Sequence, residues 1–253
     1  MNIIQANRDA WNRRVREAQN PYTLPVTTEQ IEAARNGHWT VHLTPAKPVP
    51  HAWSGDVSGK DVLCLASGGG QQGPMLAAAG ARVTVFDLSD GQLARDREVA
   101  EREGLTLHTV QGEMTDLSVF SDGSFDLIVH PVSNCFIPDV NPLWHEAFRV
   151  LRPHGALLAG MVNPLLYALA DDDEALTLQN PIPYSDDARM TEAERRRRLA
   201  EGGALEFGHT LQDLIGGQLK AGFVITDFDE STFGGRRVDA FIATMFATRA
   251  VKP

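Results

Sequence analysis

Residues 62–87 constrain the fold more than any other stretch of this sequence. They comprise VLCLASGGGQQGPMLAAAGARVTVFD, that is, an apolar run, a glycine cluster, a helix-like segment, a second apolar run and a terminal acid, Asp87. That order is typical of the first β-α-β unit of a nucleotide-binding sheet. Gly68, Gly70 and Gly73 satisfy the G-x-G-x-x-G spacing. This spacing does not by itself identify the nucleotide-like cofactor that the glycines would meet.

The rest of the chain continues this unit as one α/β sheet. From residue 61 onward, short apolar runs alternate with helical patterns, which is typical of strands buried on both faces of a parallel sheet. The last two runs are joined by about ten residues, too few for a helical crossover, so we expect these strands to be antiparallel neighbours. The predicted strands are residues 62–66, 82–87, 106–110, 125–130, 155–161, 223–228 and 239–247.

Residue types at the ends of the predicted helices support these boundaries. Ser89 followed by Gln92 predicts a capping box at the start of one helix, and Gly104 is placed to end it. Asn141 followed by Pro142 predicts the start of another helix, with asparagine as the N-cap and proline in the first turn. Local residue chemistry therefore delimits the helices between the strands.

The 253 residues suffice for one α/β domain with a small insertion and are too few for two catalytic domains. Helical patterns followed by several prolines predict an N-terminal helical cap over about residues 1–55. The strand-helix alternation stops at residue 162 and resumes at residue 211, so residues 162–210 are a predicted insertion. The core of the single domain comprises residues 61–161 and 211–250.

Gly216 and Gly217 interrupt the otherwise helical segment 211–221. Each glycine costs about 0.5–1 kcal/mol relative to alanine in a helix interior. Their presence predicts close packing at this point, either against the sheet or against a second subunit of a homodimer. The sequence does not choose between these two partners, so the oligomeric state stays open.

The charge of the chain disfavours a nucleic-acid partner. The sequence has 23 Lys and Arg against 33 Asp and Glu, a formal net charge of −10, whereas binding to a phosphate backbone needs clustered positive charge. The dense basic run from Arg195 to Arg198 lies between Glu192, Glu194 and Glu201. We therefore expect a helix whose arginines form i,i+4 ion pairs.

Cysteine usage and hydropathy predict a soluble cytoplasmic protein. Cys64 and Cys135 form neither a disulfide framework nor a metal-ligand spacing, so we expect no metal site and a reducing compartment. The N-terminal residues MNIIQANRDAWNRRV lack the apolar core of a signal peptide. No run approaches the roughly 18 apolar residues of a membrane span, so we expect no membrane partner.

Five segments together resemble the class I S-adenosylmethionine-dependent methyltransferases over residues 61–247. They are VLCLASGGG, VTVFDLS, VQGEMTDLSVF, SFDLIVHPVS and EAFRVLRPHGALLAG, in the order of that family. The resemblance implies a Rossmann-like doubly wound α/β sheet of seven strands in the order 3-2-1-4-5-7-6, with strand 7 antiparallel. It also implies S-adenosyl-L-methionine as the cofactor, S-adenosyl-L-homocysteine as the product, and a substrate lid at residues 162–210.

The resemblance places the loop after the first strand under the methionine part of the cofactor, where glycine permits close backbone approach. In the family an acid usually sits two residues before the first glycine, but here Cys64 takes the acid's place and Ala66 the glycine's. We expect the backbone of Ala66 and Ser67 and the side chain of Gln72 to substitute for it. The alternative for Gln72 is solvation of the helix start. The loop residues predicted to contact the cofactor are Ala66, Ser67, Gly68, Gly69 and Gly70.

The resemblance also assigns residues to the adenosine part of the cofactor. Asp87, at the end of the second strand, would accept hydrogen bonds from both ribose hydroxyls, with Leu88 beside it. In GEMTDL, Glu113 would accept from the adenine amino group while the backbone N–H of Met114 meets a ring nitrogen. Asp116 is the competing acid in the same segment.

Two histidines are candidates for catalysis. His130 ends the fourth strand, where this family often places residues that touch the methyl group and the acceptor. We predict that its backbone reaches the methionine end of the cofactor, while its side chain faces the acceptor and acts as a general base. His209 is the second candidate base. For His130 the alternative is a structural, half-buried imidazole. Tyr167 and Tyr184 lie in the predicted lid, where they either contact the acceptor or form the lid's own core.

The predicted reaction is transfer of a methyl group to a small-molecule acceptor by in-line displacement, which needs alignment but no covalent protein nucleophile. A general base assists transfer to a hydroxyl or amine acceptor, whereas an ionised acceptor does not need one. Two alternatives stay open. One is an NAD(P)-dependent oxidoreductase, which the glycine spacing and Asp87 alone would permit. The other is an S-adenosylmethionine-binding protein without turnover, because the first motif is altered.

Overall fold

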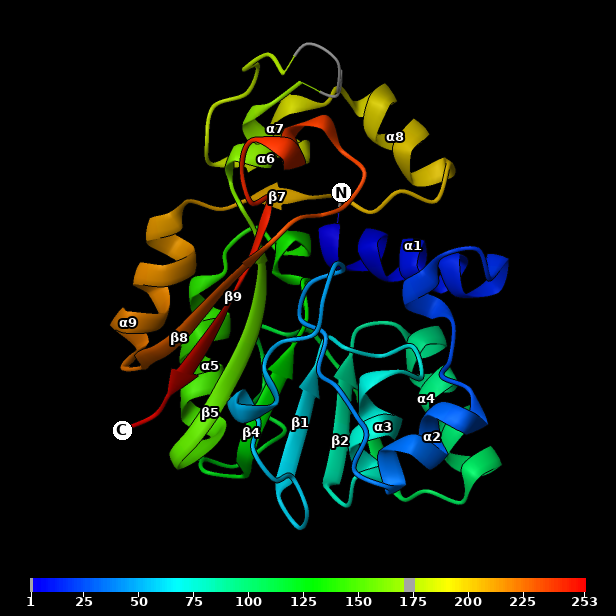
Figure 1. Cartoon of the computed structure of the whole chain (residues 1–253). Helices are drawn as coiled ribbons and strands as arrows, with labels where there is room; N and C mark the ends of the chain where they lie inside the picture. The colour runs from blue at the N-terminus through cyan, green and yellow to red at the C-terminus, as the bar shows by residue number, and fades with distance from the viewer. Residues whose placement is uncertain (1, 171–175) are drawn as a thin grey trace.

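The structure, a computed structural model, describes residues 2–170 and 176–253 and contains one seven-stranded sheet (Figure 1). The strand order is β3-β2-β1-β4-β5-β9-β8. Neighbours from β3 to β5 are parallel, whereas β9 pairs antiparallel with both β5 and β8. Since β8 and β9 are the sixth and seventh strands of this sheet, the predicted order 3-2-1-4-5-7-6 is confirmed.

The strands of the main sheet have the following bounds: β1 Asp61–Leu65, β2 Arg82–Asp87, β3 Leu107–Gln111, β4 Phe125–His130, β5 Leu151–Val162, β8 Val224–Ser231 and β9 Met245–Val251. A separate two-stranded ladder pairs β6 (Tyr184–Ser185) with β7 (Phe207–Gly208). The helices are α1 Ile3–Glu17, α2 Thr28–Arg35, α3 Gln72–Ala78, α4 Asp90–Glu103, α5 Asn141–Val150, α6 Leu165–Ala168, α7 Asp186–Arg189, α8 Glu192–Ala200 and α9 Gly217–Ala221.

Helices cover both faces of the sheet, which explains the continuous apolar runs in its central strands. On β1, Leu63 and Leu65 pack in one core cluster with residues of α5, including Trp144. The alternate residues Val62 and Cys64 pack in a second cluster with residues of α3 and α4. All four β1 side chains are fully buried. The alternation of a strand thus feeds two hydrophobic cores, one on each face.

The helix boundaries agree with the sequence only in part. Ser89 caps α4, because its Oγ accepts the N–H of Gln92 at 3.1 Å, and Gly104 ends that helix with a φ of +64°. The capping box is wrong, since the Gln92 side chain turns away toward the glycine loop. Asn141 is also not the N-cap of α5: it is the first helical residue, and its N–H donates to Asp139 Oδ1 at 2.9 Å.

The last strand begins later than predicted. Residues 239–244 belong to a 3-10 turn (Arg237–Ala240) and the connection that follows it, and β9 starts only at Met245. Asp239 holds this turn: its Oδ2 accepts the N–H groups of Gly234 and Arg236 at 3.0 Å each, and its Oδ1 accepts Thr244 Oγ1 at 2.6 Å. The apolar run therefore includes a turn that side-chain hydrogen bonds stabilise.

Helix α1 and the described residues of the 162–210 insertion lie together above the carboxyl ends of the parallel strands (Figure 1). Helix α1 also packs against α4, and α2 lies lower, against α3. The acidic run from Asp171 to Glu174 lies outside the described residues. Among the helices described, none combines the length and the apolar character needed to cross a membrane.

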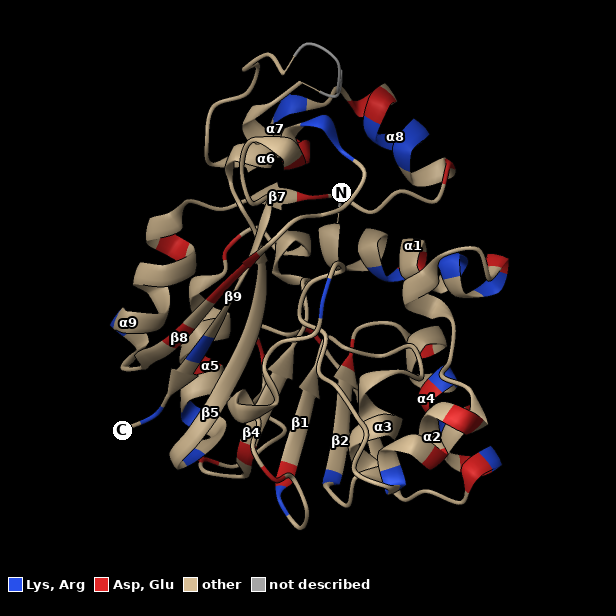
Figure 2. Ribbon diagram, in the orientation of Figure 1, with Lys and Arg blue, Asp and Glu red and all other residues tan. Residues whose placement is uncertain are grey.

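Arginines of α8 are paired with acids, as Figure 2 shows for the alternating colours on that helix. Arg196 pairs with Glu192, and Arg197 with Glu201 at 2.8 Å, both at i,i+4 spacing. These pairs confirm the predicted helix face. Arg198 differs, because it turns inward to Glu206 at 3.0 Å.

The glycine pair lies where a π-helix (Gln212–Gly216) continues into α9. A Cβ on Gly217 would come within 2.6 Å of Trp144 Cδ1 on α5. Trp144 cannot move aside easily, because its Nε1 donates to the carbonyl of Asp213 at 2.9 Å. A Cβ on Gly216 would meet only the end of the Gln212 side chain. Gly217 is therefore closely packed, and its neighbour in this chain is α5 and not the sheet. Packing against a second subunit stays a prediction.

We expect Gly217→Ala to lower the free energy of unfolding by about 1–3 kcal/mol, because overpacking forces Trp144 out of place. Gly216→Ala is the matched control, since Gln212 can move and alanine favours the helix by about 0.5–1 kcal/mol. Urea unfolding of both variants measures the difference. Equal stability of the two variants would contradict this packing.

Candidate active site

A cavity of about 1300 Å³ lies at the carboxyl end of the sheet. Its wall includes Ala66 after β1, Asp87 at the end of β2, Glu113 after β3 and Pro131 after β4. The opposite wall comes from the N-terminal segment, including Trp11 on α1, and from the 162–210 insertion. The fold thus brings four strand ends and two distant segments to one cavity.

The loop after β1 presents Ala66, Ser67 and Gly68 to this cavity, as predicted. Ala66 has a φ of +49°, and its N–H donates to the carbonyl of Phe86 at 2.7 Å. Ser67 is buried, and its Oγ has no hydrogen-bond partner among the described residues. The loop therefore offers a free hydroxyl and main-chain groups at the bottom of the cavity.

Gly69 and Gly70 do not line the cavity, which does not support the prediction that they contact the cofactor. A Cβ on Gly69 would lie 2.5 Å from the carbonyl oxygen of Tyr22, and one on Gly70 would lie 2.9 Å from that of Arg95. Both residues have positive φ values, +120° and +75°. Glycine is required here because the loop packs against α4 and the N-terminal segment.

Asp87 is positioned by two backbone N–H groups. Its Oδ2 accepts from Gly68 at 2.9 Å and its Oδ1 from Ser89 at 2.8 Å. The carboxyl group faces the cavity beside Leu88. Burial raises the pKa of Asp87 to about 6, and the N–H groups of Ser89 and Gly68 act in the opposite direction. Above pH 6 the cavity therefore holds a fixed carboxylate at the end of β2.

The two acids of the segment after β3 lie in different environments. Glu113 and Met114 both line the cavity. Glu113 Oε2 accepts the N–H of Thr115 at 3.1 Å, while its buried Oε1 has no partner in the described part of the chain. Asp116 is exposed outside the cavity and accepts the N–H of Ser118 at 3.0 Å. Of the two acids, only Glu113 is placed to meet a ligand.

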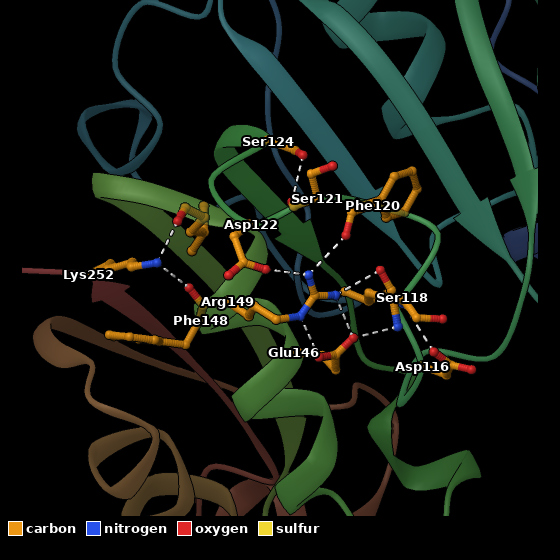
Figure 3. A network of polar contacts seen from close by, with 12 residues as sticks. Asp116, Ser118, Phe120, Ser121, Asp122, Ser124, Glu146, Phe148, Arg149 and Lys252 are labelled. Carbon is orange, nitrogen blue, oxygen red and sulfur yellow. Dashed lines mark hydrogen bonds and ion pairs between the residues drawn. The ribbon is translucent and has the colours of Figure 1, made fainter.

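Arg149 on α5 holds this segment in place, as Figure 3 shows. Its guanidinium donates to both carboxylate oxygens of Glu146 at 2.7 and 2.8 Å, to Asp122 at 2.8 Å, and to the carbonyls of Phe120 and Leu117 at 2.9 Å each. Glu146 in turn accepts the N–H of Leu117 at 2.8 Å. Sequence reasoning did not single out this residue, although the i,i+3 spacing of Glu146 and Arg149 was a signal.

Gln72 lines the cavity and connects α3 to the N-terminal segment. Its Oε1 accepts the N–H of His42 at 3.4 Å. The neighbouring Gln71 donates to the carbonyls of Pro21 and Leu24 at 2.7 and 2.9 Å. Both glutamines therefore bind protein groups, and neither only solvates the helix start.

His130 lies buried away from the cavity, which does not support its predicted role as a base that faces the acceptor. The side chain is 0% exposed and does not line the cavity that the described residues form. Its Nδ1 donates to the carbonyl of Leu65 at 3.0 Å, and its Nε2 accepts from Asn134 Nδ2 at 3.4 Å. Burial lowers its pKa to about 4. The imidazole thus joins β4 to β1 as a neutral structural group.

His209 is likewise outside the cavity lining. It is buried, and its Nε2 donates to the carbonyl of Asn134 at 3.0 Å. Asn134 also donates to the carbonyl of Gly160 at 2.7 Å. His130, Asn134 and His209 therefore connect β4, the loop after it, β5 and the chain after β7. Neither of the two predicted bases is in contact with the cavity.

His42, which sequence reasoning missed, is the histidine that does line the cavity. Its ring is half-buried and makes no hydrogen bond with any residue that the structure describes, and burial lowers its pKa. The adjacent Leu43 carbonyl accepts the N–H of Val132 at 2.9 Å. At Gly160, a Cβ would collide with that carbonyl. The backbone at His42 is thus held over the ends of β4 and β5.

The insertion contributes a buried polar and aromatic wall. The rings of Tyr167 and Tyr184 stack with their centroids 5.5 Å apart. Tyr167 donates to Glu206 at 3.1 Å and Tyr184 to Asp186 at 2.7 Å. Arg198 lies within 3.2 Å of Asp186 and 3.0 Å of Glu206. The tyrosines line the cavity and also hold the insertion together. Their contact with an acceptor stays a prediction.

Asn7 attaches helix α1 to the loop after β4 and to the segment before β7. The Asn7 side chain donates to the carbonyls of Phe136 and Leu205 at 2.9 and 3.1 Å, and accepts the N–H of Leu205 at 2.7 Å. On the same helix Trp11 meets the Phe136 ring edge to face at 5.4 Å. These contacts could not be inferred from the helical pattern alone.

We expect the pH dependence of the free energy of unfolding to show that His130 is buried and neutral in the folded protein. Because its pKa in the folded state lies below that of an unfolded histidine, the unfolded chain takes up this proton first as the pH falls below about 6.5. His130→Asn keeps a side-chain N–H but removes the titration. The wild type should lose about 1.4 kcal/mol per pH unit relative to this variant between about pH 6.5 and 4, measured by urea unfolding. A pH-independent difference would show that the imidazole titrates normally.

Comparison with known proteins agrees with this geometry. A sequence profile described as a methyltransferase domain matches residues 63–159. The chain is 49% identical over 253 residues to the Bacillus subtilis (strain 168) protein named uncharacterized methyltransferase YbaJ, and the match covers 99% of this chain and 98% of that protein.

Solved structures show the same fold. An S-adenosylmethionine-dependent methyltransferase from Mesorhizobium loti matches with a TM-score of 0.60 and 19% identity, covering 79% of this chain and 94% of that one. Burkholderia thailandensis 1,6-didemethyltoxoflavin-N1-methyltransferase, solved with 1,6-didemethyltoxoflavin and S-adenosylhomocysteine, matches at 0.62 and 15%, covering 98% of this chain and 88% of that one. Membership is inconsistent with the NAD(P)-dependent alternative. The chain belongs to the class I S-adenosylmethionine-dependent methyltransferase family.

Proposed function

We propose that this enzyme methylates a small-molecule acceptor that binds between the strand ends and the N-terminal and 162–210 segments. The observation that carries the proposal is a large, partly open cavity with polar groups suited to the cofactor on one wall and aromatic side chains on the other. The negative net charge of −10 and the paired arginines of α8 favour a small molecule over a polynucleotide. We place the reaction in the cytoplasm, since Cys64 and Cys135 are both free thiols.

The cavity wall fits S-adenosylmethionine. Ser67 Oγ, Gln92 Oε1 and Glu113 Oε1 are buried without a partner among the described residues, and all three residues line the cavity. Buried polar atoms are nearly always paired in native proteins, so these atoms suit a ligand with several hydrogen-bonding groups. In this proposal Asp87 holds the ribose, Glu113 and Met114 hold the adenine, and Ala66, Ser67 and Gly68 hold the methionine end.

The reaction needs alignment more than acid-base chemistry. When bound, the sulfonium of the cofactor supplies a methyl group already activated toward displacement. The chain contributes a fixed orientation from the loop after β1 and a cavity whose walls limit access of water to the reacting atoms. For a hydroxyl or amine acceptor, His42 is placed to take the proton, because its free imidazole faces the cavity and its lowered pKa keeps it neutral at pH 7.

We expect Asp87→Ala and Glu113→Ala each to weaken S-adenosylhomocysteine binding by about 1.5–3 kcal/mol, the usual scale for hydrogen bonds to a charged group. Asp116→Ala is the matched control, because Asp116 lies outside the cavity. Isothermal titration calorimetry measures the three dissociation constants. If Asp116→Ala weakened binding as much as Glu113→Ala, the assignment of the adenine site would fail.

Incubating the enzyme and S-adenosylmethionine with a metabolite extract should give a product heavier by one methylene, detected by mass spectrometry. If that acceptor carries a hydroxyl or amine, His42→Ala should lower its turnover by about 10²–10⁴ without changing S-adenosylhomocysteine affinity. Unchanged turnover with such an acceptor would remove His42 from the chemistry. Cofactor binding without any product would favour the alternative of a binding protein without turnover.

A further inference from the structure

Asp96 is a buried acid that the proposed mechanism does not use. It lies on α4 directly below the loop after β1, with 0% of its surface exposed. Its Oδ2 accepts the N–H of Gly69 at 3.0 Å, an N–H that is shared with the carbonyl of Gln92 at 3.2 Å. The N–H of Gly70 also stabilises the carboxyl group. Its Oδ1 has no partner among the residues described. An isolated acid at such a position needs an explanation, because burying it is costly.

The neighbour of Asp96 on the sheet is Cys64, which stands where the family has an acid. Burial and the proximity of Asp96 both raise the pKa of the Cys64 thiol, so Cys64 stays protonated and supplies no carboxylate. Both side chains lie on the side of the sheet that α3 and α4 cover. Strand β1 has no carboxyl group at Cys64, and Asp96 of α4 therefore supplies one on the same side of the sheet.

The conformation of the loop makes this carboxyl group important. With φ values of +120° and +75°, Gly69 and Gly70 turn their N–H groups away from the cavity and toward α4. Buried backbone N–H groups without an acceptor are strongly disfavoured. The two residues before them, Ser67 and Gly68, form the cavity floor. Whatever pairs the Gly69 and Gly70 N–H groups thus sets the position of Ser67 and Gly68.

The geometry points to Asp96 as a positioning residue for the cofactor. Its carboxyl group holds the N–H groups of Gly69 and Gly70 and thereby shapes the loop that contacts S-adenosylmethionine. From α4 it replaces the acid that β1 lacks at Cys64. This role rests on the proposed cofactor site. Asp96 itself does not line the cavity and acts only through the loop.

The protonation state decides which substitution preserves the role. Burial raises the pKa of Asp96 to about 8; Asp87 adds to this rise, while the two loop N–H groups and Arg97 oppose it. At pH 7 the group is therefore mainly a neutral acid that accepts N–H groups through one oxygen. An asparagine amide offers the same acceptor oxygen in nearly the same shape, whereas alanine offers none.

The test is S-adenosylhomocysteine affinity at pH 7, measured by calorimetry together with urea unfolding of each variant. Asp96→Ala should weaken binding at least about tenfold, while Asp96→Asn stays within about threefold of the wild type. Phe223→Leu is the control for lost stability alone, because Phe223 is buried beside Phe148 at the other edge of the sheet. It should lower stability but leave the affinity within about threefold.

In the double variant Cys64→Asp/Asp96→Ala, the acid returned to β1 should restore affinity to within about threefold of the wild type.

Several results would overturn the role of Asp96. Wild-type affinity in Asp96→Ala, or an equal loss in Phe223→Leu, would show that Asp96 serves stability only. An Asp96→Asn variant as weak as Asp96→Ala would show that acceptance of the loop N–H groups is not the function. A double variant that does not recover binding would contradict replacement of the acid at Cys64. A wild-type chain that does not bind S-adenosylhomocysteine would instead contradict the proposed cofactor site itself.

Discussion

The turn after β1 leaves successive backbone N–H groups inside the protein, and the cavity depends on how these groups are paired. Gly68 donates to Asp87 on β2 and Gly69 donates to Asp96 on α4. The carbonyl of Gly70 accepts the N–H of Val26 from the N-terminal segment. Each partner belongs to a different element, so the turn is fixed only when strand, helix and cap are all assembled. Few alternative conformations can satisfy all of these bonds, which gives the cavity floor a defined shape.

Much of the fold is encoded locally, and that part was predictable. Strands such as β1 and β4 are buried on both faces, so they appear as continuous apolar runs whatever the rest of the chain does. The start of β9 was misplaced for a different reason: Asp239 and Thr244 stabilise a turn inside an apolar run through side-chain hydrogen bonds. Periodicity does not register such bonds, since they depend on a specific three-dimensional arrangement.

The site residues divide in the same way, into those that the local sequence predicts and those whose position depends on long-range contacts. The prediction placed Asp87 and Glu113 at strand ends, and both face the cavity because parallel strands end at one edge of the sheet. His130 also ends a strand, but its imidazole pairs with the carbonyl of Leu65, far away in the sequence. His42 lies in a proline-rich stretch without regular structure, where no pattern indicates which way a side chain points. For both histidines, contacts between residues far apart in the sequence decide where the side chain lies.

The attachment of α1 through Asn7 bears on how such an enzyme changes its acceptor during evolution. The Asn7 side chain bonds to main-chain atoms of Phe136 and Leu205, not to their side chains. Cavity-facing residues such as Phe136 can therefore be exchanged without removing the bonds that hold the helix in place. The main-chain bonds that hold α1 are thus independent of the side chains that line the cavity. These side chains can change one at a time, and the acceptor with them, while the cofactor site stays the same.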